Sequence, residues 1–256
     1  MRTIGLIGGM SWESSAEYYR LLNGLTRERL GGHHCAPSVM ITVDFAEIEA
    51  MQRADDWQGA AERLAEAAVG LERAGAELVV LCTNTMHRVA DDIAAAIRIP
   101  FVDIVDVTAE RILAAGSGTV GLLGTRFTME GGFYRARMAA HGIEVLVPEA
   151  SDRALVHDVI YRELTRGVVR DSSRQEFRRI IGDLAERGAD GVVLGCTEIP
   201  LLIGPADTPV HLFDTTRLHV EHAVELALAA PDAVPGGTSA PARPAATGGG
   251  ACSAPG

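Results

Sequence analysis

Short apolar runs alternate along the chain with longer stretches in which apolar residues recur every three or four positions. Continuous apolar runs are typical of buried parallel strands, and the longer period predicts helices that cover them. The expected strands are Thr3–Ile7, Val39–Val43, Leu78–Leu81, Phe101–Ile104, Thr119–Leu123, Val145–Val147, Val192–Leu194 and Val210–Phe213. The expected helices are Ser14–Arg29, Trp57–Arg73, Arg88–Ile97, Thr108–Ala114, Thr128–Ala140, Arg153–Thr165, Arg174–Glu186 and Arg217–Ala229. This alternation predicts an α/β fold with parallel sheets.

Three landmarks occur twice, in the same order. "TIGLIGG" returns as "TVGLLGT", "VVL" returns inside "GVVLGCTEI", and "IPFVDIVD" is echoed by "TPVHLFD", each 109 to 116 residues later. The alternative is that all parallel strands look alike. We predict two similar parallel-sheet α/β domains related by a pseudo-twofold, with an active site in the cleft between them.

The domain boundaries follow from this repeat. We place the first domain at residues 1–100 and the second at 101–214, followed by a helix at 215–230. After that helix the sequence consists of Pro, Gly, Ala and Ser without periodicity, which predicts a disordered tail over residues 231–256.

Composition removes several classes of function. A net charge of −11 argues against a nucleic-acid partner. No apolar run approaches the roughly 18 residues of a membrane span, and no signal segment opens the chain, so we expect no membrane partner and a cytoplasmic location. The sequence contains no lysine, which excludes a pyridoxal phosphate held in the usual way as a lysine Schiff base.

Small polar segments follow four of the expected strands. They are Gly8–Ser11, Cys82–Thr85, Gly124–Thr125 and Cys196–Glu198, two from each half. Ligands bind outside the carboxyl ends of parallel strands, and helix N-termini attract anions there. The alternative is that these residues only cap the following helices. If the halves face each other, all four segments line one cleft.

The cysteines suggest acid–base chemistry rather than a metal or a disulfide. Cys35, Cys82, Cys196 and Cys252 have neither zinc nor disulfide spacing, so we expect free thiols and no metal. A thiol at a helix N-terminus has a lowered pKa and can act as a base or nucleophile, although buried cysteines are more often inert. Two facing domains that each offer one proton-carrying group have the geometry needed to invert a stereocentre.

Four segments resemble one known family. "IGLIGGMSWESSAEYYRLLN", "LCTNTMH", "LLGTRFTM" and "GCTEIPLL" are similar to the cofactor-independent aspartate/glutamate racemases, in particular the bacterial aspartate/glutamate and broad-specificity amino-acid racemases. The resemblance covers residues 1 to about 230. It implies an amino-acid substrate, no cofactor, a last helix that returns to the first domain, and a homodimer.

The resemblance also implies a catalytic pair, with one departure. The family pairs a cysteine in C-N-T-x-H with one in G-C-T. Cys196 matches the second, but Thr83 precedes Asn84 where the first is expected, and Cys82 comes one residue too early. Because side chains alternate along a strand, we expect Thr83 to oppose Cys196 unless a bulge brings Cys82 round. Cys196 is then the thiolate base, and Thr83 relays a proton on the other face. We therefore expect asymmetric kinetics, with faster processing of the enantiomer whose α-proton faces Cys196.

The remaining assignments concern the substrate. The resemblance assigns substrate contacts to Met10, Gln52, Asn84, Thr85, Thr125, Thr197 and Glu198. Glu198 either holds the ammonium or accepts backbone N–H bonds at its helix start. Gln52 and Thr165 lie near the positions where strict aspartate members carry basic residues, so neutral polar amino acids are expected beside aspartate and glutamate.

The leading hypothesis is a racemase that interconverts L- and D-amino acids by two-sided proton transfer at Cα. Two alternatives remain open. One is a related isomerase or decarboxylase on the same scaffold, acting on a hydantoin, maleate or an arylmalonate-like acid. The other is a small-molecule binder without catalytic activity.

Overall fold

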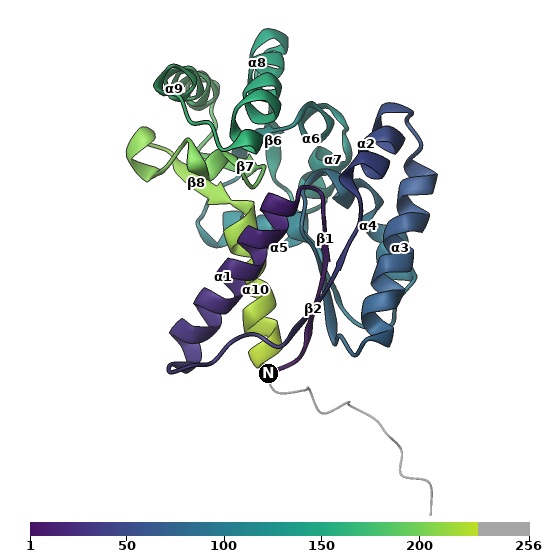
Figure 1. Cartoon of the computed structure of the whole chain (residues 1–256). Helices are drawn as coiled ribbons and strands as arrows, with labels where there is room; N and C mark the ends of the chain where they lie inside the picture. The colour runs from purple at the N-terminus through teal and green to yellow at the C-terminus, as the bar shows by residue number, and fades with distance from the viewer. Residues whose placement is uncertain (230–256) are drawn as a thin grey trace, which may run out of the picture.

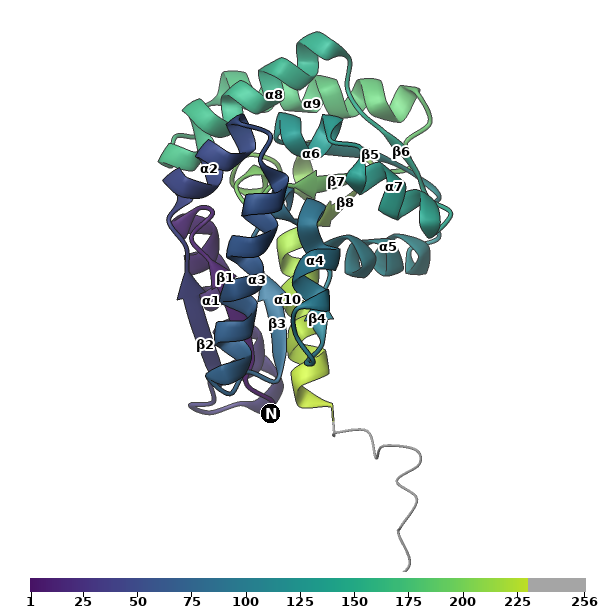
Figure 2. The ribbon, with the colours of Figure 1, turned by 90° about the vertical axis from the view of Figure 1, so that its right-hand side faces the viewer.

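Two four-stranded parallel sheets form the framework of the computed structural model, which describes residues 1–229. The first sheet has the order β2-β1-β3-β4 and the second the order β6-β5-β7-β8 (Figure 1), with all eight strands labelled in Figure 2. Both sheets therefore have the same topology. The strands are β1 (Ile4–Gly8), β2 (Ser38–Thr42), β3 (Leu78–Leu81), β4 (Phe101–Val102), β5 (Thr119–Gly124), β6 (Glu144–Leu146), β7 (Gly191–Gly195) and β8 (His211–Asp214).

Helices cover the sheets, and the second domain lies over the carboxyl ends of β1 and β3 (Figures 1 and 2). The α-helices are α1 (Trp12–Leu30), α2 (Phe45–Arg53), α3 (Trp57–Arg73), α4 (Ala90–Ala95), α5 (Ile104–Ala114), α6 (Arg126–Glu130), α7 (Phe133–Ala140), α8 (Ala150–Arg162), α9 (Asp171–Glu186) and α10 (Thr215–Leu228). Short 3-10 turns are η1 (Thr85–Val89), η2 (Leu164–Arg166), η3 (Ile199–Leu201) and η4 (Pro205–Asp207). The α/β prediction with two similar domains is confirmed.

The register of the strands gives the correspondence between the two halves. Leu81 of β3 pairs with Ile7, and Leu194 of β7 pairs with Leu123, so these two leucines are equivalent. Two residues further along the chain, Thr83 is equivalent to Cys196. At the edge strands, Val79 pairs with Phe101 and Val192 with Leu212, so Phe101 corresponds to Leu212. The sequence comparison of "IPFVDIVD" with "TPVHLFD" was therefore displaced by two residues from the alignment that the strand pairing gives.

The first sheet has a separate core on each face. Val79 and Leu81 pack on the side of α3, whereas Leu78, Val80 and Cys82 pack on the side of α1 and α10. The last described helix, α10, contacts both α1 and α5, and its Ala227 carbonyl accepts the backbone N–H of Arg2. Thus α10 follows the last strand of the second sheet but covers the first one (Figure 1).

Local capping explains where the predicted elements were wrong. The expected strand Phe101–Ile104 ends at Val102 because the Asp103 side chain accepts backbone N–H bonds and starts α5. The expected helix Thr128–Ala140 is broken into α6 and α7 at Gly131–Gly132. Helix α2 was not predicted. Its Asp44 cap accepts the N–H of Ala46, but its nine residues bury only Ile48 and Gln52, so the apolar period is weak.

The predicted disordered tail, with Cys252, lies outside the described residues. Within residues 1–229, every helix is too short or too polar to cross a membrane.

Candidate active site

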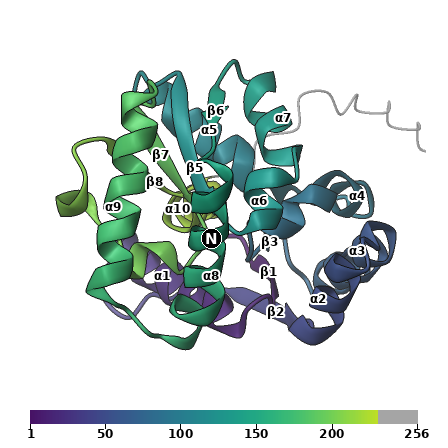
Figure 3. The same cartoon turned by 90° about the horizontal axis from the view of Figure 1, so that it is seen from above.

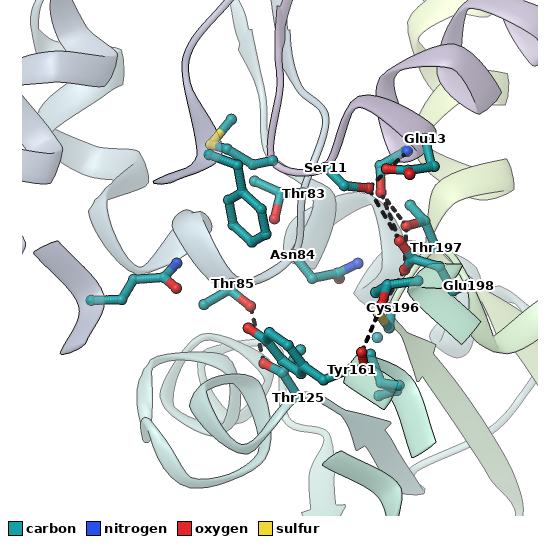
Figure 4. A pocket seen from close by; sticks show the side chains of 17 residues that line it. Ser11, Glu13, Thr83, Asn84, Thr85, Thr125, Tyr161, Cys196, Thr197 and Glu198 are labelled. Atoms are coloured by element: carbon teal, nitrogen blue, oxygen red, sulfur yellow. Dashed lines mark hydrogen bonds between the residues drawn. The ribbon is translucent and has the colours of Figure 1, made fainter. Parts of the chain in front are cut away.

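A cavity of about 260 Å³ lies between the two domains, at the carboxyl ends of their strands (Figure 4). Helices α8 and α9 of the second domain lie side by side when the molecule is seen from above (Figure 3). Segments that follow β1, β3, β5 and β7 all contribute to it, and α2 and α8 close it. Its walls contain the predicted residues Met10, Gln52, Thr83, Asn84, Thr85, Thr125, Cys196, Thr197 and Glu198, together with Ser11, Glu13, Ser14, Phe45, Ile160, Tyr161, Thr165 and Gly195. Cys82 does not line it.

The turn after β1 shapes one wall of the cavity and requires glycine. Gly9 has φ +102°, and a Cβ there would lie 2.1 Å from the carbonyl oxygen of Val43. Its backbone N–H donates to Oγ of Ser15 at 2.8 Å. Ser11 then caps α1 by accepting the N–H of Ser14, which orients both serines of the cap.

Alternation of side chains along β3 separates Thr83 from Cys82. Cys82 continues the face formed by Leu78 and Val80, and it is fully buried in the core beneath α1 and α10. Burial raises the pKa of this thiol. Thr83 faces the cavity (Figure 4). The structure thus brings Thr83 and Cys196 into one cavity and leaves Cys82, the alternative catalytic candidate, outside it; no bulge brings that sulfur round.

The Cys196 thiol is paired with a carboxylate. Its Sγ donates to Oε2 of Glu198 at 2.9 Å, and Thr197 Oγ1 donates to the same oxygen at 2.7 Å. Burial and the neighbouring Glu198 charge raise the pKa of Cys196 well above its ordinary value. The expectation of a lowered pKa at a helix N-terminus was therefore wrong for Cys196, because desolvation and the like charge of Glu198 outweigh the backbone N–H groups.

Glu198 collects hydroxyl donors rather than backbone donors. Besides the thiol and Thr197, the hydroxyls of Ser11 and Ser14 each lie 3.4 Å from Oε1. Ser14 also forms a short hydrogen bond with Thr197. No backbone N–H bond to this carboxylate occurs among the described residues, so the backbone alternative for Glu198 finds no support in its contacts. The carboxylate lies in a polar wall that joins α1 to the end of β7.

Two further polar links cross between the domains. Asn84 Nδ2 donates to Oγ1 of Thr215 at 3.0 Å, and that hydroxyl donates to the carbonyl of Leu194 at 2.9 Å. The hydroxyls of Thr85, Thr125 and Thr128 lie 3.1 to 3.3 Å from one another. These contacts hold the segment after β3 against the ends of β5 and β7.

His87 fixes the backbone of Thr83 from behind. Ile104 donates its N–H to Nε2 of His87 at 3.1 Å, so Nδ1 carries the proton and donates to the carbonyl of Thr83 at 2.7 Å. Burial lowers the pKa of His87 to about 4, so the ring is neutral near pH 7. The motif N-T-x-H therefore supplies a neutral strut that holds the candidate proton relay in place.

Comparison with known proteins decides the family. The sequence model described as Asp/Glu/Hydantoin racemase matches residues 7–223. The chain belongs to this racemase family. A candidate Asp/Glu racemase from Yersinia pestis is 50% identical, with a TM-score of 0.85 over 90% of this chain and all of that one. An aspartate racemase homologue from Pyrococcus horikoshii is 36% identical, with a TM-score of 0.80 over 89% and 99% of the two chains.

Similarity to curated relatives is lower. The broad-specificity amino-acid racemase RacX of Bacillus subtilis is 22% identical over 88% of this chain and 98% of that enzyme. The chain spans about half the length, 50% and 56%, of two curated glutamate racemases that it matches. The comparisons thus show both the family and the racemase fold.

Some residues of this racemase-family site were not found from the sequence. Ser14 and Thr215 could have been proposed from the sequence, because both follow the end of a strand by only a few residues. Tyr161 had none, since it comes from α8, far along the chain from every motif. Burial and the Cys196 charge raise the pKa of Tyr161 to about 12, so the phenol is protonated and can donate a hydrogen bond.

The lining of the racemase-family cavity carries negative charge only. Its charged members are Glu13 and Glu198, and none of the cavity-lining residues within the described part of the chain is basic. In residues 1–229, no group of three or more His, Cys, Asp or Glu side chains is arranged to hold a metal ion.

Replacing Glu198 with glutamine should lower the pKa of the Cys196 thiol by roughly one unit or more, because a like charge next to the sulfur is removed. The measurement is the pH dependence of alkylation by iodoacetamide in a Cys35→Ser, Cys252→Ser background. Glu13→Gln is the matched control, since Glu13 lines the same cavity without a hydrogen bond to Cys196, and it should leave that pKa unchanged. An unchanged or higher pKa in Glu198→Gln would contradict the pairing.

Proposed function

We propose that this protein is a cofactor-independent amino-acid racemase in which Cys196 and Thr83 handle the α-proton on opposite faces of the substrate. One observation carries the proposal: the two side chains occupy equivalent positions after β7 and β3 and line the same cavity from different domains. A cavity of about 260 Å³ suits a single small molecule. The homodimer and the cytoplasmic location expected from the sequence stay predictions.

Proton removal at Cys196 requires a thiolate. The Cys196 thiol donates its proton in a hydrogen bond to Oε2 of Glu198. A substrate ammonium entering beside Glu198 brings a positive charge, which favours the thiolate and offsets the carboxylate. Glu198 accepts the thiol proton, and the thiolate then takes the α-proton. Cys196 and Glu198 thus act as one pair rather than as a lone base.

The intermediate must be stabilised without a cationic side chain. The hydroxyls of Thr85 and Thr125 line the cavity and bond to each other, and they can turn toward the negative charge that develops on the substrate carboxylate. Thr83, held by His87, returns a proton to the opposite face, directly or through water. Solvent then reprotonates Thr83 and takes the thiol proton from Glu198, so the site returns to its starting charge. A hydroxyl is a weaker acid than a thiol, so the two half-reactions have different barriers.

Deuterium exchange tests this proposal. L-amino acids incubated in D₂O without added cofactor should yield D-enantiomers that carry deuterium at Cα. The equilibrium constant of one makes kcat/KM equal in both directions, so the expected asymmetry has to be measured as unequal isotope effects for the two α-deuterated enantiomers. Thr83→Cys should bring the two isotope effects closer together. If neither exchange nor inversion occurs across a broad panel, the racemase proposal is wrong and a binding function is favoured.

A further inference from the structure

Two amide oxygens at the cavity have no hydrogen-bond partner. They are Oε1 of Gln52 and Oδ1 of Asn84. Both side chains line the cavity, and both residues are more than nine-tenths buried, with exposed fractions of 6% and 3%. Buried polar atoms are nearly always hydrogen-bonded in native proteins. The protein supplies no donor to either oxygen, so a bound molecule is needed to supply one.

The orientation of each amide is fixed by its neighbour. The Thr215 hydroxyl gives its only proton to the carbonyl of Leu194, so it must accept from Nδ2 of Asn84. Gln52 places Nε2 2.9 Å from Sδ of Met86, and a thioether can only accept. Neither amide can therefore turn its oxygen toward the protein contact, and both oxygens remain acceptors.

Thr165 adds a third acceptor to the lining. Its hydroxyl donates to the carbonyl of Tyr161 at 3.0 Å, which leaves only oxygen lone pairs for a ligand. Gln52 and Thr165 are helical residues, from α2 and η2, whereas most of the polar lining comes from strand ends. The part of the wall that these two residues form thus offers acceptors for a hydrogen-bond donor.

The charges of the cavity lining also favour a hydrogen-bond donor over a carboxylate on the substrate side chain. The charged residues of the lining are the acidic Glu13 and Glu198. Arg53, next to Gln52 in sequence, is exposed, bonds to Glu49 at 2.6 Å and does not line the cavity. A second carboxylate on the substrate would lose its hydration without gaining a cation, and it would face lone pairs at Gln52 and Thr165.

We infer that the substrate is an α-amino acid whose side chain ends in an uncharged hydrogen-bond donor, a carboxamide or a hydroxyl, which Gln52 accepts through Oε1. This inference rests on the proposed racemase function. Asn84 accepts through Oδ1 from the α-ammonium, which also lies within the field of Glu198. Gln52 is the residue that selects against side-chain carboxylates.

Isosteric substrate pairs test the inference in the full-length protein. Asparagine should be racemised with a kcat/KM at least roughly tenfold above that of aspartate, and glutamine above glutamate, because each pair differs only in donor and charge. Asparagine should likewise exceed leucine, which has a similar shape and no donor. Rates equal to or higher for the two carboxylates would overturn the inference while leaving the racemase function in place.

Variants at the α2 wall separate recognition from general damage. Gln52→Met removes the acceptor and should lower kcat/KM for asparagine roughly tenfold or more while leaving leucine within about twofold. Arg53→Gln, in the neighbouring exposed residue, should change kcat/KM for neither asparagine nor leucine. Equal losses for asparagine and leucine in Gln52→Met would contradict the assigned acceptor. If no amino acid of the panel is racemised or exchanges its α-hydrogen, this inference falls together with the proposed function.

Discussion

Cys196→Ala is expected to reduce racemisation by a factor of roughly 10² to 10⁴, the range of a lost acid–base catalyst, while Cys82→Ala retains most of the activity. Of these two cysteines, only Cys196 lines the cavity and bonds to Glu198. Cys82 is fully buried with Leu78 and Val80 on the opposite face of β3. The measurement is the initial rate of D-enantiomer formation by each variant.

Stability measurements make this comparison decisive. Cys82→Ala removes one buried sulfur and should cost roughly 1 kcal/mol of folding free energy, so its thermal midpoint should fall slightly. Cys196→Ala should keep the native fold, because the sulfur lies in a partly open site. If Cys82→Ala loses turnover with its fold intact, Cys82 is the partner of Cys196 and the assignment of Thr83 is wrong.

Acidification from pH 7 to pH 4 should remove several kcal/mol of folding free energy through two buried histidines. Burial lowers the pKa of His87 to about 4 and that of His219 to about 3. Unfolded histidine titrates near pH 6.5, so below that pH the unfolded chain binds protons that the native state refuses. Their contribution is complete above about pH 6.5 and falls as the pH drops toward the folded pKa values, by roughly 3 kcal/mol for each ring at pH 4.

Hydrogen bonds show why these rings stay neutral. His219 donates from Nε2 to the carbonyl of Val102 at 2.8 Å and accepts at Nδ1 from the hydroxyl of Tyr18 at 2.9 Å, so a second ring proton would face the phenol proton. Burial raises the pKa of Asp103 and Asp214. These carboxyl groups bind protons more tightly in the folded state, so their contribution to the unfolding free energy increases as the pH falls.

Urea unfolding at pH values from 4.5 to 7.5 measures the effect. His219→Gln keeps polar ends without a titrating ring and should flatten the dependence of the unfolding free energy on pH between 4.5 and 6.5. His34→Gln, on an exposed residue, should leave the slope as in the wild type. A slope that His219→Gln and His87→Gln both leave unchanged would contradict the assignment.

Local pattern was enough to locate the framework and many of the residues that line the candidate site. Eight apolar runs became eight strands, and the repeated phrase marked equivalent strand ends, so alternation alone separated Thr83 from Cys82. Helix α2 was missed because it buries few residues. The pKa of Cys196 was predicted in the wrong direction, because the helix-terminus argument ignored a carboxylate two residues further along. Tyr161 depends on packing between distant elements, which a local pattern cannot contain.

The return of α10 to the first sheet has a consequence for biosynthesis. The core on the α1 side of β3 is completed by residues of α10, namely Val220, Ala223, Val224 and Ala227. These residues are translated after both sheets. Domains usually fold from the N-terminus as the chain emerges from the ribosome. Here the half that is made first cannot complete its core until α10 leaves the ribosomal exit tunnel, so the order of maturation runs against the order of synthesis.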